Sequence, residues 1–232
     1  MEIRRAELQT YRNAAPDDAV VVIDVLRSFT TAAYLLHAGA QTILLAATPD
    51  DARILARRVP LALTVGAVPG GMPIDGFDLG NSPAAICGIN LAGRDVVLCT
   101  AGGVRGVAAA RNAAVLLGSS LVCAAATARL LRRFNPSHVT LLVTGMYIDR
   151  DGDEDIACAD YLAALLRGER PDPQPFERRV RESTFGRRFG HPAHPQLSTA
   201  DLNLCARADL FDFAMPIKEH EGSMVLTREH ET

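Results

Sequence analysis

The feature that most constrains the fold is the repeated succession of a short apolar run and a helix-forming stretch. The run VVVID at residues 20–24 has four adjacent β-branched residues, which is typical of a strand buried on both faces. The chain contains at least five such strand-to-helix units, so we predict an α/β fold with three layers, α/β/α, around a largely parallel or mixed sheet. We expect residues 1–169 to form this main domain and residues 170–232 to pack on it as a C-terminal segment.

Several boundaries of these units can be predicted from local patterns. Thr48 before Pro49, and Asn81 or Ser82 before Pro83, have the pattern of a helix N-terminus, and Asn135 before a proline predicts a helix end. Other elements that we predict are strands at 42–46 and 95–100, a helix over 104–117 and a strand at 120–124.

Composition indicates a soluble globular protein, with 48% hydrophobic and 22% charged residues among 232. The net charge of −3 gives no broad basic face, which argues against nucleic acid as a partner. No apolar run reaches the roughly 20 residues of a membrane-spanning helix, so no membrane association is expected. The five widely spaced cysteines fit reduced thiols, which predicts a cytoplasmic protein, and the apolar content is compatible with a homodimer.

The first strand ends in a cluster of polar residues. Asp24 and Arg27 follow the apolar run, and Ser28, Thr30 and Thr31 have side chains able to cap the next helix. Ligands of open parallel sheets bind beyond the carboxyl ends of the strands, so Asp24 and Arg27 are catalytic candidates and Ser28 and Thr30 are binding candidates. The alternative is an Asp24–Arg27 ion pair that only caps the helix.

Two later loops have the composition of binding loops. Residues 66–81 are too rich in Gly and Pro for regular structure, yet they contain Asp78 and Asn81, although a solvated connector is the alternative. Gly102 and Gly103 lie between a strand and a helix, where backbone N–H groups can approach an anion, and Arg105 follows on the first turn.

An acidic cluster precedes a further amphipathic helix. Its members are Asp149, Asp151, Asp153, Glu154 and Asp155, more acids than helix capping needs. A Mg²⁺ ion binds through one or two carboxylates together with substrate oxygens, and Glu154 and Asp155 lie nearest the expected helix start. Together with the loops described above, these acids indicate a small phosphorylated ligand and a divalent cation.

Known sequence motifs limit which class of phosphate-binding protein this chain can belong to. No Asp-x-Asp follows the first strand, no Gly-Lys-Ser/Thr of a Walker loop occurs, and a dinucleotide fingerprint is absent. The segment from Cys99 to Arg105 has the Cys-x5-Arg spacing of cysteine-dependent phosphatases. However, Leu98 and Gly106 stand where those enzymes usually have His and Ser or Thr, which favours a buried structural cysteine.

Five segments resemble, in order, the ComB family of 2-phosphosulfolactate phosphatases: VVIDVLRSFTTA, GFDLGNSPA, TAGGVRGV, DEDIACA, and GRRFG with DLNLCARAD. The resemblance implies an α/β fold and Mg²⁺-dependent hydrolysis of (R)-2-phospho-3-sulfolactate to sulfolactate and phosphate, a step toward coenzyme M. The matching positions that it supports as site residues are Asp24, Arg27, Asp78, Asn81, Arg105, Glu154, Asp155 and Arg187.

The chain departs from the family pattern in three loops. Ala101 to Arg105 reads AGGVR where the family usually has Thr-Asn-Gly-Thr-Arg, Phe29 stands where a hydroxyl residue is usual, and residues 67–69 replace an expected Glu-Arg pair. Cys99 matches a Thr in the family, so its spacing to Arg105 looks coincidental.

We therefore predict a phosphatase that acts on a small anionic phosphate ester. Mg²⁺ is expected at Asp24, Glu154 and Asp155, and the anionic groups of the ester at Arg27, Arg105, Arg187 and Arg188. The turn at Gly102 and Gly103 would bind a phosphoryl oxygen. Three alternatives remain open at this point: a diverged binder of a phosphorylated metabolite without turnover, a Cys99-dependent phosphatase, and a sugar-phosphate or keto-acid enzyme of another class.

Overall fold

The computed structural model describes residues 1–13, 18–146 and 149–230, and in them the strands form one mixed sheet. The strand order is β1-β8-β2-β7-β9-β10-β3-β6-β4-β5, and β11 pairs with β9. The strands are β1 (Glu2–Glu7), β2 (Ala19–Ile23), β3 (Ile43–Ala46), β4 (Leu63–Gly66), β5 (Leu79–Gly80), β6 (Val96–Cys99), β7 (Val115–Ser119), β8 (His138–Val143), β9 (Phe213–His220), β10 (Ser223–Leu226) and β11 (Glu229–His230).

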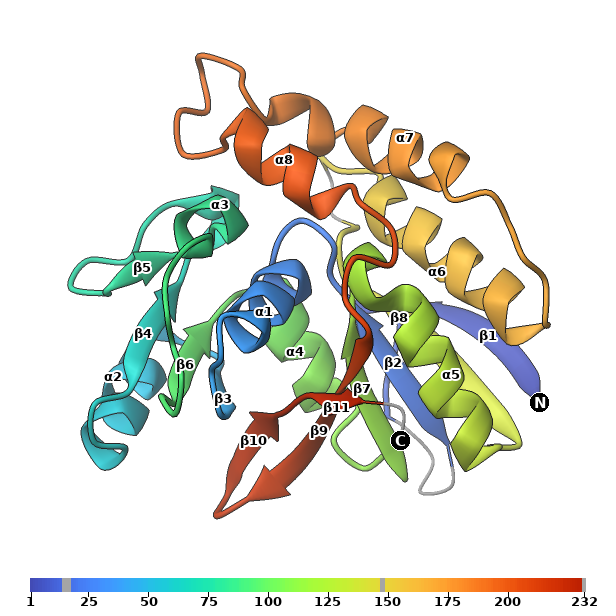
Figure 1. Ribbon diagram of the computed structural model, residues 1–232, viewed down its shortest axis with the longest axis horizontal. Helices are drawn as coiled ribbons and strands as arrows, with labels where there is room; N and C mark the ends of the chain where they lie inside the picture. Colours follow the sequence, from blue (N-terminus) through green and yellow to red (C-terminus); the bar gives the residue numbers. More distant parts are fainter. Residues whose placement is uncertain (14–17, 147–148, 231–232) are drawn as a thin grey trace.

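Helices cover the sheet, which confirms the predicted α/β/α class (Figure 1). The α-helices are α1 (Ser28–His37), α2 (Pro49–Arg58), α3 (Pro83–Ile86), α4 (Gly102–Ala109), α5 (Ala124–Phe134), α6 (Asp153–Leu166), α7 (Gln174–Glu182) and α8 (Thr199–Cys205). Short 3-10 turns are η1 (Pro69–Gly71), η2 (Leu121–Cys123) and η3 (Gly186–Arg188). None of the helices in the described part of the chain is long and apolar enough to cross a bilayer.

The sheet consists of two parallel groups of strands joined by an antiparallel pair. Strands β1, β8, β2 and β7 are parallel to one another, as are β3, β6, β4 and β5. Strand β9 is antiparallel to β7, and β10 is antiparallel to β9 and β3. Figure 1 shows the two groups on opposite sides of α1 and α4.

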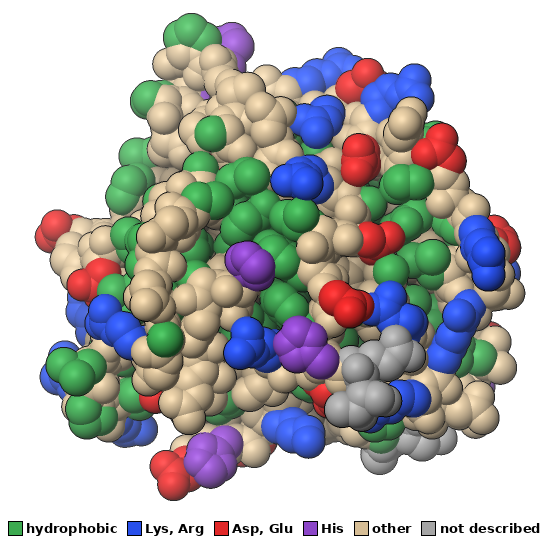
Figure 2. Space-filling model, viewed as in Figure 1, with side chains coloured by type: hydrophobic (Ala, Val, Ile, Leu, Met, Phe, Trp, Pro, Cys, Tyr) green, Lys and Arg blue, Asp and Glu red, His purple; other side chains and the backbone are tan. Residues whose placement is uncertain are grey.

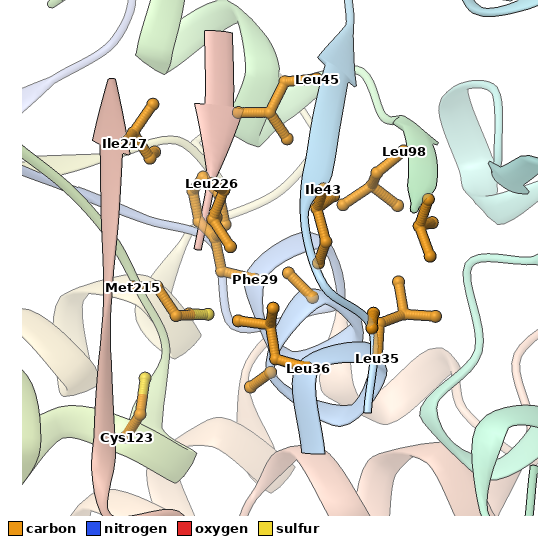
Figure 3. Close-up of a cluster of buried hydrophobic side chains, with 14 of the residues drawn as sticks. Phe29, Leu35, Leu36, Ile43, Leu45, Leu98, Cys123, Met215, Ile217 and Leu226 are labelled. Atoms are coloured by element: carbon orange, nitrogen blue, oxygen red, sulfur yellow. The ribbon is translucent and has the colours of Figure 1, made fainter. Parts of the chain in front are cut away.

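The C-terminal segment supplies the centre of this sheet. Met215 and Ile217 of β9 and Leu226 of β10 belong to the same buried cluster as Phe29 and Leu36 of α1 (Figure 3). A second buried cluster lies under α5, α6 and α7 and includes residues of β2 and β8. The segment after residue 169 thus pairs with strands of the first part of the chain in addition to packing on it.

The strand predicted at 120–124 was placed too late in the chain. Helix α4 ends at Ala109, the strand β7 covers 115–119, and residues 121–123 form the turn η2. The alanine-rich stretch favours helix by propensity alone, but the apolar run that starts at Val115 pairs with β2 on one side and β9 on the other. Tertiary pairing therefore overrides the local preference.

Charged side chains of both signs are interspersed over α6 and α7 on the face shown in Figure 2. Several form ion pairs, such as Arg179 with Asp153 and Asp160. On this face no continuous basic area is visible.

Candidate functional site

A cavity of about 300 Å³ lies beyond the carboxyl ends of strands from both parallel groups. Asp24 and Thr144 line it after β2 and β8, and Ala67 and Thr100 line it after β4 and β6. The cavity thus lies where ligands bind in open α/β sheets. The sequence-predicted residues that line it are Asp24, Arg27, Ser28, Asn81, Gly102, Arg105 and Arg188.

Asp24 is held in place by the first turn of α1. Its Oδ1 accepts a hydrogen bond from the Ser28 backbone N–H at 2.9 Å, and its Oδ2 accepts one from the Ser28 hydroxyl at 2.6 Å. The carboxylate is only 7% exposed, and that exposure is toward the cavity that it lines. Each oxygen keeps further acceptor capacity, because a carboxylate oxygen has two lone pairs. Asp24 is thus an oriented carboxylate at the cavity wall.

The prediction that hydroxyl side chains cap α1 was wrong. The N-cap is Arg27 and no side chain makes the capping hydrogen bond. The Ser28 hydroxyl donates to Asp24, and the Thr30 hydroxyl donates to the Val25 carbonyl at 2.7 Å. The hydroxyls therefore fix the loop between β2 and α1.

Asp155 ties the ends of two neighbouring strands together. Its Oδ1 accepts the Val25 N–H at 2.8 Å, and its Oδ2 accepts the N–H groups of Thr144 at 3.0 Å and Gly145 at 2.7 Å. The side chain is fully buried and does not line the cavity. Burial, followed by the charges of Asp24 and Glu154, raises the pKa of Asp155, and the Val25 hydrogen bond opposes this shift.

Glu154 is buried beside Asp155 and is paired with Arg150. Its Oε1 accepts a hydrogen bond from Arg150 Nη2 at 2.7 Å, whereas its buried Oε2 accepts none from the described residues. The Arg150 guanidinium lies 3.6 Å from the centre of the Phe185 ring, and both residues line the cavity. Burial raises the pKa of Glu154, while Arg150 lowers it. Arg150 is thus a cavity-lining cation that compensates this buried carboxylate.

The arginines predicted to bind anions differ in their partners. Arg105 on α4 is exposed, lines the cavity, and makes no hydrogen bond or ion pair with a described residue. Arg188 lines the cavity while bonding the Asp149 carboxylate at 2.9 Å. Arg27 is buried and paired with Asp201 at 2.8 Å. Arg187 is exposed and does not line the cavity. Arg105 is therefore the cavity cation with all its donors available to a ligand.

Gly102 makes room for Asp24. A Cβ at this position would lie 2.8 Å from Asp24 Oδ2 and 3.2 Å from Thr144 Oγ1. We expect Gly102→Ala to displace the Asp24 carboxylate and to reduce turnover by about 10²-fold, the effect of a misplacement near 1 Å. Steady-state phosphate release by the variant measures this.

Gly80→Ala is the control, because a Cβ there meets nothing within 4 Å. Full activity of Gly102→Ala would contradict the placement of Asp24 against α4.

The other predicted site residues have structural contacts. Asp78 accepts hydrogen bonds from the Thr64 backbone N–H at 2.8 Å and the Thr64 hydroxyl at 2.6 Å, which anchors the 66–81 loop and lowers the pKa of Asp78. Gly103 lets α4 approach α1, since a Cβ there would lie 3.1 Å from Ser28 Cβ. Neither residue lines the cavity.

Comparison with known proteins identifies the family. Residues 5–220 match the family model described as 2-phosphosulpholactate phosphatase. A probable 2-phosphosulfolactate phosphatase of Bacillus subtilis is 30% identical over 211 residues, which cover 90% of this chain and 91% of the relative. The chain belongs to the 2-phosphosulfolactate phosphatase family. Proteins with the same description from Carboxydothermus hydrogenoformans (31% identical, 91% of each chain) and Thermus thermophilus (37% identical, 70% of this chain and 67% of the relative) are also similar.

Residues of this family member that the sequence reasoning missed also belong to the site. Thr144, Arg150 and Phe185 line the cavity, and Asp201 binds Arg27. Thr144 has one available signal, because it ends an apolar strand as Asp24 does. Arg150 lies in sequence among the acids of the cluster, so it could pair with any of several neighbouring carboxylates. The sequence alone does not single out Glu154 as its partner.

The donor set allows a test of the predicted Mg²⁺ site. Within 1–13, 18–146 and 149–230, no three His, Cys, Asp or Glu side chains form a ready-made metal site. Asp155 does not fit as a ligand at the cavity, because its side chain is buried, does not line the cavity and already accepts three backbone N–H groups. Asp24 keeps acceptor capacity at the cavity, whereas Glu154 is fully buried and does not line the cavity, although its Oε2 has no described partner. Of the three predicted ligands, Asp24 therefore fits a Mg²⁺ ion at the cavity that takes its other ligands from water and substrate.

Proposed function

We propose that this protein is a Mg²⁺-dependent phosphatase that hydrolyses 2-phosphosulfolactate to sulfolactate and inorganic phosphate. Family membership supports the reaction class. The observation that carries the proposal is the placement of the Asp24 carboxylate, the start of α4 and the unpaired Arg105 guanidinium around one cavity. A helix N-terminus and an arginine with free donors can bind a phosphoryl group, and a positioned carboxylate can act on it.

Each group has a separate task. Arg105 would bind the phosphoryl oxygens, since its guanidinium can make bidentate bonds to phosphate. The amides at the start of α4 would bind a further oxygen. Arg27 would add donors for the phosphoryl group, and Arg188 would bind the carboxylate or sulfonate group of the substrate. Bound Mg²⁺ would neutralise charge that develops on the phosphoryl oxygens. Asp24, fixed by Ser28, would present its carboxylate to the reacting phosphate.

Phosphate release from 2-phosphosulfolactate, compared with release from 2-phospholactate, tests the substrate. We expect a higher kcat/KM for the sulfonate-bearing ester because the cavity has cations beyond Arg105. Equal values would contradict sulfonate recognition. Ligand-induced stabilisation of the fold without any phosphate release would instead identify a non-catalytic binder.

A thiol mechanism at Cys99 is not supported by the structure. The side chain is 3% exposed, packs with Ala46, Ala52 and Val97, and does not line the cavity. Burial raises the pKa of Cys99 to about 11, which suppresses the thiolate that such chemistry needs. Cys99→Ser should therefore keep kcat within about twofold of the wild type and lower stability by about 1–3 kcal/mol through a buried hydroxyl. Loss of turnover in a folded variant would restore the thiol hypothesis.

Glu154→Gln is expected to make the fold more stable at neutral pH. Burial raises the folded-state pKa of Glu154 above the unfolded value, so the native state binds the proton more tightly. Stability of the wild type then decreases as pH rises from the unfolded pKa through the folded pKa. The gain in Tm of the variant should be small at pH 4 and larger at pH 7. A lower Tm at pH 7 would show that the pair with Arg150 outweighs the cost of burial.

A further inference from the structure

We propose that Asp201 is a positioning residue that holds the Arg27 guanidinium at the cavity wall. The proposal rests on the proposed function and adds to its site a residue that lies 174 positions after Arg27 in the sequence. Asp201 Oδ2 accepts a hydrogen bond from Arg27 Nη1 at 2.8 Å. The side chains of Arg27 and Asp201 are 3% and 2% exposed, so this is a buried ion pair at the edge of the ligand cavity.

The Asp201 carboxylate is itself fixed by its other oxygen. Its Oδ1 accepts the Ser82 hydroxyl at 2.7 Å and the Ala84 backbone N–H at 2.9 Å. The Asp201 backbone N–H donates to the Ser198 hydroxyl, which caps α8. One carboxylate thus joins the starts of α3 and α8 to the loop before α1, and it has little freedom to rotate.

Arg27 is enclosed on several sides but keeps donors for a ligand. Its Nη1 also approaches the Gln196 carbonyl at 3.4 Å, and its guanidinium carbon lies 5.6 Å from the centre of the Phe189 ring. Gly71 has a φ of 76°, and a Cβ there would lie 2.7 Å from Arg27 Nη2. Neither Nε nor Nη2 makes a hydrogen bond to a described residue, and Arg27 lines the cavity.

These contacts determine what Asp201 contributes. A buried guanidinium without a counter-charge carries a large desolvation penalty, so Arg27 could not stay at this depth alone. Asp201 compensates the charge through Nη1 and leaves the other donors in a fixed orientation. Donors that are oriented before the substrate binds need no reorganisation during the reaction. Asp201 therefore acts on the substrate through Arg27 and does not touch it.

A double-mutant cycle with Arg27→Ala and Asp201→Asn tests the proposal. We expect Asp201→Asn to reduce kcat/KM by about 10–100-fold in the wild type, the effect of a misplaced catalytic group, and to have no further effect in the Arg27→Ala background. Multiplied losses would show that Asp201 acts independently of Arg27 and would overturn the proposal.

Protein stability gives a second readout. Asp201→Asn alone should lower Tm, because Arg27 loses its partner. In the Arg27→Ala background the same change should raise Tm, because it removes a buried negative charge that has lost its counter-charge. A decrease in both backgrounds would contradict the pairing. Asn203→Ala is the matched control, because Asn203 is an exposed residue of the same helix whose side chain contacts Arg181 and not Arg27; its kcat/KM should stay close to the wild type.

Titration with inorganic phosphate separates this proposal from the proposed function. We expect Asp201→Asn and Arg27→Ala to weaken phosphate binding, measured by calorimetry, and the double variant to bind as Arg27→Ala does. This readout needs no turnover, so it applies even if 2-phosphosulfolactate is not hydrolysed. An unchanged phosphate Kd in Asp201→Asn would overturn the positioning role whether or not the wild type hydrolyses the ester.

Discussion

Asp24→Asn is expected to reduce phosphate release by about 10²–10⁴-fold, the contribution of a positioned carboxylate to proton transfer or an equivalent step. The substitution removes the charge at the cavity wall and keeps the size of the side chain. Asn still offers an acceptor to the Ser28 backbone N–H, so the loop before α1 should keep its conformation. Steady-state kinetics with 2-phosphosulfolactate measures the loss, and circular dichroism checks the fold.

Asp50→Asn is a suitable control for the Asp24 variant. Asp50 lies in the first turn of α2, its side chain is 90% exposed, and its partner Arg53 is also at the surface. This variant should keep wild-type turnover. Wild-type turnover in Asp24→Asn would show that the Asp24 carboxylate takes no part in the reaction.

Arg105→Ala is expected to reduce kcat/KM by about 10²–10³-fold, the cost of losing one donor that stabilises developing charge. Arg105 has no described partner, so its removal leaves no buried carboxylate unpaired and the fold should keep its Tm. Arg105→Lys should recover part of the loss, because lysine keeps the charge and loses the bidentate geometry.

Arg111→Ala is the corresponding control. Arg111 follows α4, its side chain is 58% exposed, and it pairs with Glu219 outside the cavity. A surface pair of this kind contributes little to stability, so both activity and Tm should be close to the wild type. Equal losses in the Arg105 and Arg111 variants would indicate general electrostatic attraction in place of a specific contact.

Local patterns predicted those parts of the fold that depend on neighbouring residues. Thr48 caps α2, Ser82 caps α3, and α5 ends at Asn135, which adopts φ 46°. The apolar run at residues 20–24 corresponds to β2, which is buried on both faces between β7 and β8. Such features follow from side-chain shape and hydrogen bonding within a few residues, so the sequence determines them directly.

The site itself depends on contacts that no local pattern contains. Asp155 was predicted as a metal ligand because it is acidic and near a helix start, but its carboxylate accepts backbone N–H groups from two strand ends. Asp201 reaches Arg27 only because α8 folds over the loop before α1. Phe29 follows a polar cluster in sequence, yet it is 1% exposed and packs against Gly103 and Gly118.

The most direct test of the account is the release of inorganic phosphate from racemic 2-phosphosulfolactate by the wild-type protein, first with excess Mg²⁺ and then after addition of EDTA. We expect a Mg²⁺-dependent phosphatase to release phosphate, to stop when EDTA is added, and to resume when Mg²⁺ is restored in excess. No release under either condition would contradict the proposed substrate, and release that continues in EDTA would contradict the role of the metal at Asp24.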